Sequence, residues 1–192
     1  MKIDLLRIYS LFDSLDNYHI RGEDSITSTF IVGHDASESG YSFIKVTTNL
    51  KDSKVEMRYP LTEEKKSLSS TAREAVALLH FLQVKGRSLS GHKIQTYSDS
   101  RVLESALTKG AKSCTLQDIM LSIHDELERN NIVLKTTWMP RTSPIISKVD
   151  GISRFSVTEE EEFDRDSWGF SDADIETFLE FFNRKRLLNG TP

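Results

Sequence analysis

Four acidic residues have types and spacing that could do chemistry together: Asp35, Glu74, Asp99 and Asp150. Asp35 and Asp99 each follow a run rich in β-branched and aromatic residues, so each stands where a chain leaves a sheet and faces a cleft. Carboxylates brought within roughly 4 Å of one another repel strongly unless a cation such as Mg²⁺ lies between them. If these side chains converge, the sequence predicts a metal site.

Three of these acids also have an ordinary structural explanation. Asp35 could be a strand-ending turn residue, because Asp favours such positions. Asp99 could cap the helix expected after it. Asp150 stands in an Asp-Gly pair, which is a frequent turn dipeptide, and nothing local to it demands a metal. Taken one at a time, these three acids are consistent with a metal-binding role and with an ordinary structural role.

Glu74 is more informative because it lies on the apolar stripe of a predicted helix. Ala77, Leu78 and Phe81 follow it at three, four and seven positions, so they share one helix face with its carboxylate. A carboxylate on a face that packs against a sheet needs a cation. The alternative is a capping box in which Thr71 begins the helix and pairs with Glu74. The sequence supports both explanations.

The elements that would position these acids are three strands, a helix, a strand, two helices, a strand and a final segment that reaches Asp150. Turn-forming residues at 49–53 favour an antiparallel meander of the first three strands. The later alternation implies a mixed sheet crossed by helices. We expect strands at 26–32, 41–48, 54–59, 92–97 and 131–139 and helices at 72–85, 101–108 and 115–129, with Gly86, Gly110 and Pro140 closing the elements before them.

Composition sets outer limits on the function. The chain has 192 residues, of which 38% are hydrophobic and 28% charged, and no apolar run approaches the roughly 18 residues of a membrane span. The net charge is −4, but residues 155–192 contain ten acids and four bases, which leaves +2 for residues 1–154. The acidity belongs to the tail, so a nucleic acid partner is not excluded.

The cysteine content and the first residues predict an intracellular protein. Cys114 is the single cysteine, so an internal disulfide and a cysteine-based metal site are excluded, which suits a reducing compartment. We expect Cys114 to have a small buried or capping role at a helix start. Residues 1–16 carry Asp4 and Asp13 and have no small-residue cleavage site, so secretion is not expected.

Several short motifs together resemble the ribonuclease H domain of retroelement reverse transcriptases, most closely those of DIRS-type (tyrosine-recombinase) retrotransposons. No one motif is specific, and their joint order and spacing carry the resemblance over roughly residues 25–154. The matching segments are His34-Asp35-Ala36-Ser37 with Gly40-Tyr41, Ser69-Ser70-Thr71-Ala72-Arg73-Glu74, Tyr97-Ser98-Asp99-Ser100, Trp138-Met139-Pro140-Arg141 and Val149-Asp150-Gly151-Ile152-Ser153-Arg154.

The resemblance implies an α/β, ribonuclease H-like fold with a five-stranded mixed sheet, three antiparallel strands then two parallel, flanked by helices. It implies that Asp35, Glu74, Asp99 and Asp150 are the catalytic, metal-binding acids, with Asp35 and Asp99 contacting both of two Mg²⁺ or Mn²⁺ ions. Such enzymes hydrolyse the RNA strand of RNA–DNA hybrids. The family often has a histidine before the last acid, and residues 141–149 contain none, so we expect slower or altered turnover.

The expected organisation is an N-terminal helix or extension at 1–24, the ribonuclease H-like domain at 25–154, and an acidic linker with a C-terminal helix at 155–192. The expected partners are an RNA–DNA hybrid and a reverse transcriptase domain in the same polyprotein. The alternatives are a catalytically inactive module that binds nucleic acid or protein, and a related nuclease acting on DNA. We expect Trp138 in the core and phosphate contacts from basic residues near the site, chiefly Lys93, Arg101 and Arg141, with Lys85, Arg87, Lys109 and Lys112 as further candidates.

Overall fold

The computed structural model describes residues 29–46, 54–154 and Ala173. The expected N-terminal helix or extension and almost all of the acidic C-terminal segment lie outside the described residues. The described elements are β1 (Thr29–Ala36), β2 (Gly40–Val46), β3 (Lys54–Pro60), α2 (Glu63–Lys66), α3 (Ser70–Lys85), the 3₁₀ helix η3 (Gly86–Leu89), β4 (Lys93–Ser98), α4 (Arg101–Lys109), α5 (Cys114–Arg129), β5 (Val133–Trp138) and α6 (Pro144–Ser153).

The strands form one five-stranded sheet in the order β3-β2-β1-β4-β5. β1, β2 and β3 pair antiparallel, whereas β1 with β4 and β4 with β5 pair parallel. This confirms the mixed sheet that the sequence predicted. β1 is the middle strand, and its parallel register with β4 places Gly33 opposite Tyr97. The two strands therefore end side by side, at the end of the sheet where Asp35 and Asp99 lie.

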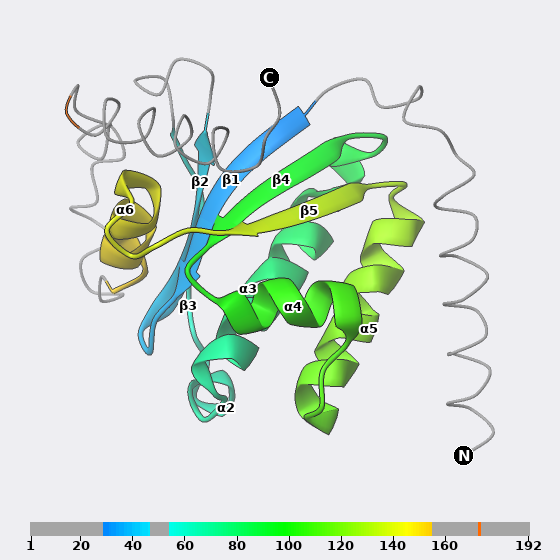
Figure 1. Ribbon diagram of the computed structural model, residues 1–192, viewed down its shortest axis with the longest axis horizontal. Helices are drawn as coiled ribbons and strands as arrows, with labels where there is room; N and C mark the ends of the chain where they lie inside the picture. Colours follow the sequence, from blue (N-terminus) through cyan, green and yellow to red (C-terminus); the bar gives the residue numbers. More distant parts are fainter. Residues whose placement is uncertain (1–28, 47–53, 155–172, 174–192) are drawn as a thin grey trace, which may run out of the picture.

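Helices cover both faces of the sheet (Figure 1). One cluster of buried apolar side chains joins α3, α4 and α5 to one face, and a second cluster joins α6 to the other face. Alternate residues of β1 supply the two clusters: Val32 and Ala36 point to the first, and Ile31 points to the second. A side chain on α6 and a side chain on α3 can therefore reach the same sheet end from opposite faces.

The ends of several elements differ from the predicted ones. β1 runs to Ala36 because the ladder with β2 continues through Asp35 opposite Ser42, so Asp35 lies within the strand and not after it. α3, α4 and α5 each begin after a serine whose side chain accepts a hydrogen bond from the backbone N–H three residues on. Cys114 is exposed, and the residue that caps α5 is Ser113, so the expected buried or capping role of Cys114 is wrong.

α6 packs closely against β1 at a glycine. A Cβ atom added at Gly33 would lie 2.1 Å from Cγ2 of Ile145, so only glycine leaves room for the helix. Side chains of the sheet then bind carbonyl groups of the helix: Ser42 Oγ donates to Val149 O at 2.7 Å, and Arg58 Nε donates to Ile152 O at 3.2 Å. Among the described residues, no helix is both long and apolar enough to span a membrane.

Replacing Gly33 with Ala should destabilise the fold by roughly 1–3 kcal/mol, the usual cost of overpacking a core. Chemical denaturation measures the loss. Ile145→Leu removes the Cγ2 methyl that the new side chain would meet, so the double variant should recover part of the stability. Strictly additive losses in this double-mutant cycle would contradict close packing between α6 and β1.

His34 predicts a pH dependence of stability. Its ring is fully buried, stacks on Phe43 with centroids 5.3 Å apart, and has no hydrogen-bond partner for either nitrogen. Burial lowers the pKa of His34 from 6.5 to about 4. Between these values the unfolded chain binds a proton that the folded chain does not, so stability should fall as the pH drops from about 6.5 to about 4, by up to roughly 1.4 kcal/mol per pH unit.

His34→Phe should flatten this part of the stability profile and leave the fold intact, because an apolar ring replaces a ring with unsatisfied nitrogens. Denaturation midpoints of both proteins across the acidic range measure the difference. The half-buried His92, whose Nδ1 lies 3.1 Å from Ser90 O, offers the control His92→Phe. An unchanged acid limb in His34→Phe would show that another group sets it.

Candidate active site

Asp35 is the second-to-last residue of β1, and the residue is 5% exposed. The hydroxyl of Ser153, the last residue of α6, lies 2.9 Å from Oδ2 of Asp35 and 2.9 Å from the carbonyl oxygen of Asp150. Burial raises the pKa of Asp35, the Ser153 hydroxyl opposes that rise, and the charges on Asp99 and Asp150 add to it. Asp35 is thus a buried acid whose pKa is raised by the charges of two other predicted site acids.

Glu74 lies one turn into α3 and is 3% exposed. Its Oε2 accepts a hydrogen bond from Ser98 Oγ at 2.7 Å, across to the end of β4. The N-cap of α3 is Ser69, whose hydroxyl accepts from the N–H of Ala72. The capping-box alternative, in which Thr71 begins the helix and Glu74 turns back to it, is therefore wrong. Glu74 points toward the sheet end and not toward its own helix start.

The charge on Glu74 is poorly compensated. The pKa of Glu74 is raised from 4.5 to about 8, chiefly by burial and also by the charges on Asp99 and Asp35. The hydrogen bond from Ser98 and the more distant charge on Arg141 lower it. A hydroxyl orients a carboxylate without neutralising it, so a cation at this position would be strongly favoured.

Asp99 follows the last residue of β4, and the residue that caps α4 is Ser100, so the capping alternative for Asp99 is also wrong. Its Oδ2 accepts a hydrogen bond from Arg141 Nε at 2.5 Å. Its backbone is fixed as well, because Trp138 Nε1 donates to the Asp99 carbonyl oxygen at 3.0 Å. Trp138, expected in the core, is half-buried and belongs to neither core cluster.

Asp150 lies in α6 and not in a turn, because the helix continues through the Asp-Gly pair to Ser153. Both of its carboxylate oxygens accept hydrogen bonds from Arg154, at 2.9 Å from Nε and 2.6 Å from Nη2. The helix places acid and base four residues apart on one face. The sequence contained this spacing, and a predicted helix over 144–153 would have revealed the pair.

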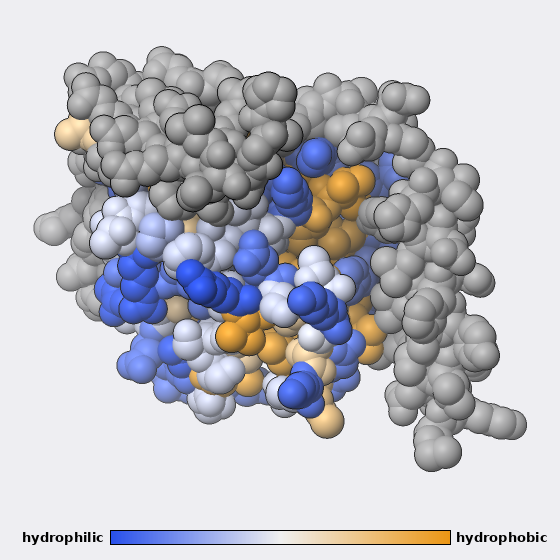
Figure 2. All heavy atoms as spheres, in the orientation of Figure 1, coloured by the Kyte–Doolittle hydropathy of each residue, from blue (hydrophilic) through white to orange (hydrophobic). Residues whose placement is uncertain are grey.

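A hollow of about 410 Å³ opens at this end of the sheet. Glu74 and Asp99 are not part of its lining, but both influence Asp35 or each other electrostatically. In Figure 2, strongly hydrophilic side chains gather over α6 and over the connection from β4 to α4. The lining consists of Asp35, Ala36, Ser37, Glu38, Ser39, Ser70, Arg73, Arg141, Asp150 and Arg154.

The four acids suit Mg²⁺ or Mn²⁺ by their chemistry, since both ions prefer carboxylate oxygens. Two of them, Asp35 and Glu74, are buried against hydroxyl groups and have raised pKa values, so their ionised forms lack a compensating cation. Within the described ranges, no three His, Cys, Asp or Glu side chains stand close enough together to hold a metal ion as they are. The residue types therefore fit such ions, and the side chains would have to close in to bind them.

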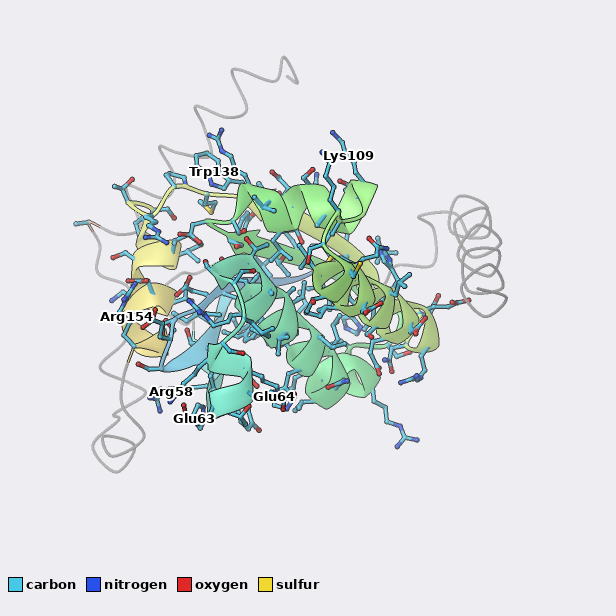
Figure 3. All side chains as sticks on the ribbon, turned by 90° about the horizontal axis from the view of Figure 1, so that it is seen from below. Arg58, Glu63, Glu64, Lys109, Trp138 and Arg154 are labelled. Atoms are coloured by element: carbon cyan, nitrogen blue, oxygen red, sulfur yellow. The ribbon has the colours of Figure 1, made fainter. Side chains whose placement is uncertain are left out.

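The predicted nucleic-acid contacts are placed unequally. Arg141 lines the hollow and pairs with Asp99. Arg101 is exposed, and its guanidinium lies 4.0 Å from the centre of the Trp138 ring. In Figure 3, Trp138 lies toward the α6 side of the molecule, as Arg154 does, whereas Lys109 lies at the far end of α4. Lys93 begins β4 opposite Thr29, so it lies at the other end of the strand from the acids, and proximity does not support its role.

Sequence reasoning missed the residues that hold the acids. Ser98 and Ser153 orient the two buried carboxylates, and Arg154 pairs with Asp150. The signal for Ser98 is its position directly before Asp99, where the alternation of a strand turns it toward the helix that carries Glu74. No pattern in the sequence links Ser153 to Asp35, which lies 118 residues earlier.

No protein-family model and no curated protein matches the sequence. Among solved structures, LC11-RNase H1 in complex with an RNA/DNA hybrid has a TM-score of 0.50 at 17% identity, covering 68% of this chain and 97% of that chain. The N-terminal RNase H domain of a Mycobacterium tuberculosis protein, solved as a fusion with maltose-binding protein, has a TM-score of 0.50 at 12% identity, covering 65% and 95%.

RNase H1 from the halophilic archaeon Halobacterium salinarum is a more distant match, with a TM-score of 0.45 at 16% identity over 65% of this chain and 93% of that chain. Together with the strand order and the pattern of parallel and antiparallel pairing, the two higher-scoring structures show that the fold is ribonuclease H-like. The predicted fold class is therefore confirmed. At these identities the likeness concerns the fold alone.

Glu74 predicts that the metal-free protein loses stability as the pH rises. Its pKa is about 8 in the folded chain against 4.5 ordinarily, so above about pH 4.5 the unfolded chain releases a proton that the folded chain keeps. The favourable contribution present below 4.5 is lost progressively up to about pH 8. Glu74→Gln should remove this loss and be more stable than the parent at neutral and higher pH in EDTA.

Urea denaturation of parent and Glu74→Gln at several pH values measures this difference. The exposed Glu64 lies at the start of α2, so Glu64→Gln is the matched control and should follow the parent. If Glu74→Gln is less stable than the parent at every pH, the carboxylate is not strained by its surroundings and the description of this site is wrong.

Proposed function

We propose that the chain is a metal-dependent endonuclease of the ribonuclease H type that hydrolyses the RNA strand of RNA–DNA hybrids. The observation that carries this proposal is the gathering of carboxylates from β1, α3, the end of β4 and α6 at one sheet end. Two of them, Asp35 and Glu74, are buried without a cation partner among the contacts described above. Holding ionised carboxylates in such surroundings costs free energy, and perturbed acids of this kind are common at functional sites. Binding of metal ions would offset that cost.

The residues of this chain would hold the metal ions and fix their positions. Asp35 and Asp99 come from adjacent parallel strands and would each contact both ions, with Glu74 and Asp150 flanking them from α3 and α6. Two bound Mg²⁺ or Mn²⁺ ions would supply activation of water and charge stabilisation at the departing 3′ oxygen during in-line attack. Ser98 and Ser153 would hold Glu74 and Asp35 in their orientations, which limits the reorganisation needed for binding.

The open hollow suits a nucleic acid backbone. It has Arg73, Arg141 and Arg154 in its lining, which are cations that recognise phosphate, together with serine hydroxyls from the β1–β2 turn. LC11-RNase H1, which has the same fold, was solved in complex with an RNA/DNA hybrid. Preference for RNA at the cleaved position would come from contacts with the 2′-hydroxyl, the group that separates RNA from DNA.

We further propose that the chain is the nuclease part of a retroelement reverse transcriptase of the DIRS type. The support is the ordered set of motifs from His34-Asp35-Ala36-Ser37 to Val149-Asp150-Gly151-Ile152-Ser153-Arg154. On this proposal, residues 1–24 lead into the nuclease domain at 25–154, and 155–192 form an acidic linker with a C-terminal helix. Sequencing the DNA upstream of this reading frame tests it: a polymerase domain in frame supports the assignment, and an unrelated gene contradicts it.

Cleavage of labelled RNA–DNA hybrid in Mg²⁺ or Mn²⁺ tests the activity. Asp99→Asn should lower the rate by more than about 100-fold, since loss of even an outer partner of a metal site usually costs 10–100-fold. Asp118 is exposed on α5, so Asp118→Asn is the matched control and should cleave at the parental rate. Activity that survives in Asp99→Asn would contradict the metal-site assignment.

Parallel assays with double-stranded RNA and double-stranded DNA separate the alternative functions. Preference for the hybrid supports the proposal, whereas preference for DNA favours the nuclease of DNA. Binding of hybrid without cleavage in either metal would favour the inactive interaction module.

A further inference from the structure

The acids of the site fall into two groups by the partners that they have. The inner acids, Asp35 and Glu74, are buried against hydroxyl groups. The paired acids, Asp99 and Asp150, bind Arg141 and Arg154, and their own side chains are 9% and 34% exposed. The two arginine side chains are 73% and 59% exposed and both line the mouth of the hollow. Each of the two paired acids therefore already has a cation of the chain itself as its partner.

The arginines occupy the atoms that a metal ion would need. Arg154 takes both carboxylate oxygens of Asp150 in a fork, at 2.6 and 2.9 Å, and Arg141 takes one oxygen of Asp99. A Mg²⁺ ion binds a carboxylate oxygen at about 2.1 Å and requires near-octahedral ligands. A guanidinium in the plane of the same carboxylate fills that space, so arginine and ion exclude each other at Asp150.

Both arginines can move away from their acids by side-chain rotation alone. In the Arg154–Asp150 pair both side chains reach solvent, at 59% and 34% exposure, and ion pairs of this kind contribute little to stability. In the Arg141–Asp99 pair the arginine is 73% exposed, whereas the carboxylate side chain is 9% exposed. Both arginine side chains are long enough to swing within the mouth of the hollow without moving the backbone. The same planar fork that fits a carboxylate also fits a phosphate, which is the group that a nucleic acid would bring there.

We propose that Arg141 and Arg154 are exchangeable counter-ions, which hold Asp99 and Asp150 until metal ions displace them and then bind phosphates of the nucleic acid backbone. This inference rests on the proposed function, because it needs the four acids to bind metal. It makes the arginines binding residues for substrate that become available only after the metal has entered. Metal and nucleic acid then strengthen each other's binding through this chain's own side chains, as linkage requires.

The first test measures metal binding alone, by calorimetric titration of the full chain with Mn²⁺. Arg154→Gln and Arg141→Gln remove a competitor and should bind Mn²⁺ roughly two- to fivefold more tightly than the parent, the range that an exposed ion pair allows. Arg154→Gln should show the larger effect because Arg154 blocks both oxygens. Arg129→Gln removes an exposed arginine paired with Glu126 on α5 and is the matched control. Unchanged or weaker Mn²⁺ binding in both site variants would overturn the proposal.

The second test measures binding of a fluorescent RNA–DNA hybrid by anisotropy, in EDTA and in Ca²⁺, with the RNA checked on a gel for integrity. In Ca²⁺ both site variants should bind more weakly than the parent, because the released arginines contact phosphate. In EDTA they should match the parent, because its arginines are already held by the acids. Equal weakening in both conditions overturns the exchange, since it would mean that the arginines contact phosphate whether or not metal is present.

Removing an arginine could also strengthen metal binding merely by removing a positive charge. The Arg154 Nε–H signal, followed by NMR, distinguishes this effect from displacement of the arginine. Displacement by Mg²⁺ should shift or broaden this signal, and addition of hybrid to the Ca²⁺-loaded protein should restore its protection. A signal that stays unchanged while Mg²⁺ binds overturns the proposal and leaves the proposed function intact. A parent protein that binds no Mn²⁺ at all contradicts the proposed function itself, so the two failures are distinguishable.

Discussion

The parallel pairing of β1 with β4 is the constraint on which the rest of the site depends. The register sets Gly33 opposite Tyr97, so Asp35 and Asp99, each two residues further on, emerge next to each other. These two strands are distant in sequence and are joined through β2, β3 and α3, which brings Glu74 over the same sheet end. A shift of one residue would turn Asp35 to the other face and separate it from α6.

The alternation within β1 explains why acids reach this point from both faces. Ile31 and Gly33 face α6, whereas Val32 faces α3. The absence of a side chain at Gly33 lets α6 approach β1 closely enough for Ser153 to reach Asp35. The site therefore depends on packing in the second core cluster as much as on the acids. A ribonuclease H-like sheet with α6 displaced would keep three of the acids and lose the fourth.

The order and type of the elements could be predicted from sequence because their signals are local. The apolar stripe that follows Glu74 predicts α3, and the β-branched run before Asp99 predicts β4. The ends of elements were less accessible, since the ladder with β2 extends β1 through Asp35 and a serine outside the predicted helix caps α3. The end of β1 is set by pairing with another strand, which the local sequence does not show. The start of α3 is ambiguous because Ser69, Ser70 and Thr71 are all residue types that cap helices.

The partners of the acids could not be predicted, and they determine what the site can do. Asp35 and Glu74 have hydroxyl partners that fix their orientation but leave their charge uncompensated. Asp99 and Asp150 have arginines, which compensate charge but are exposed enough to leave. If all four acids had arginine partners, the cluster would be a stable ion-pair network with little affinity for a further cation. Asp35 and Glu74 are buried and have no cation partner among the contacts described, so the free energy to be gained from an added cation is concentrated at these two carboxylates. A low local dielectric strengthens the binding of a divalent ion there.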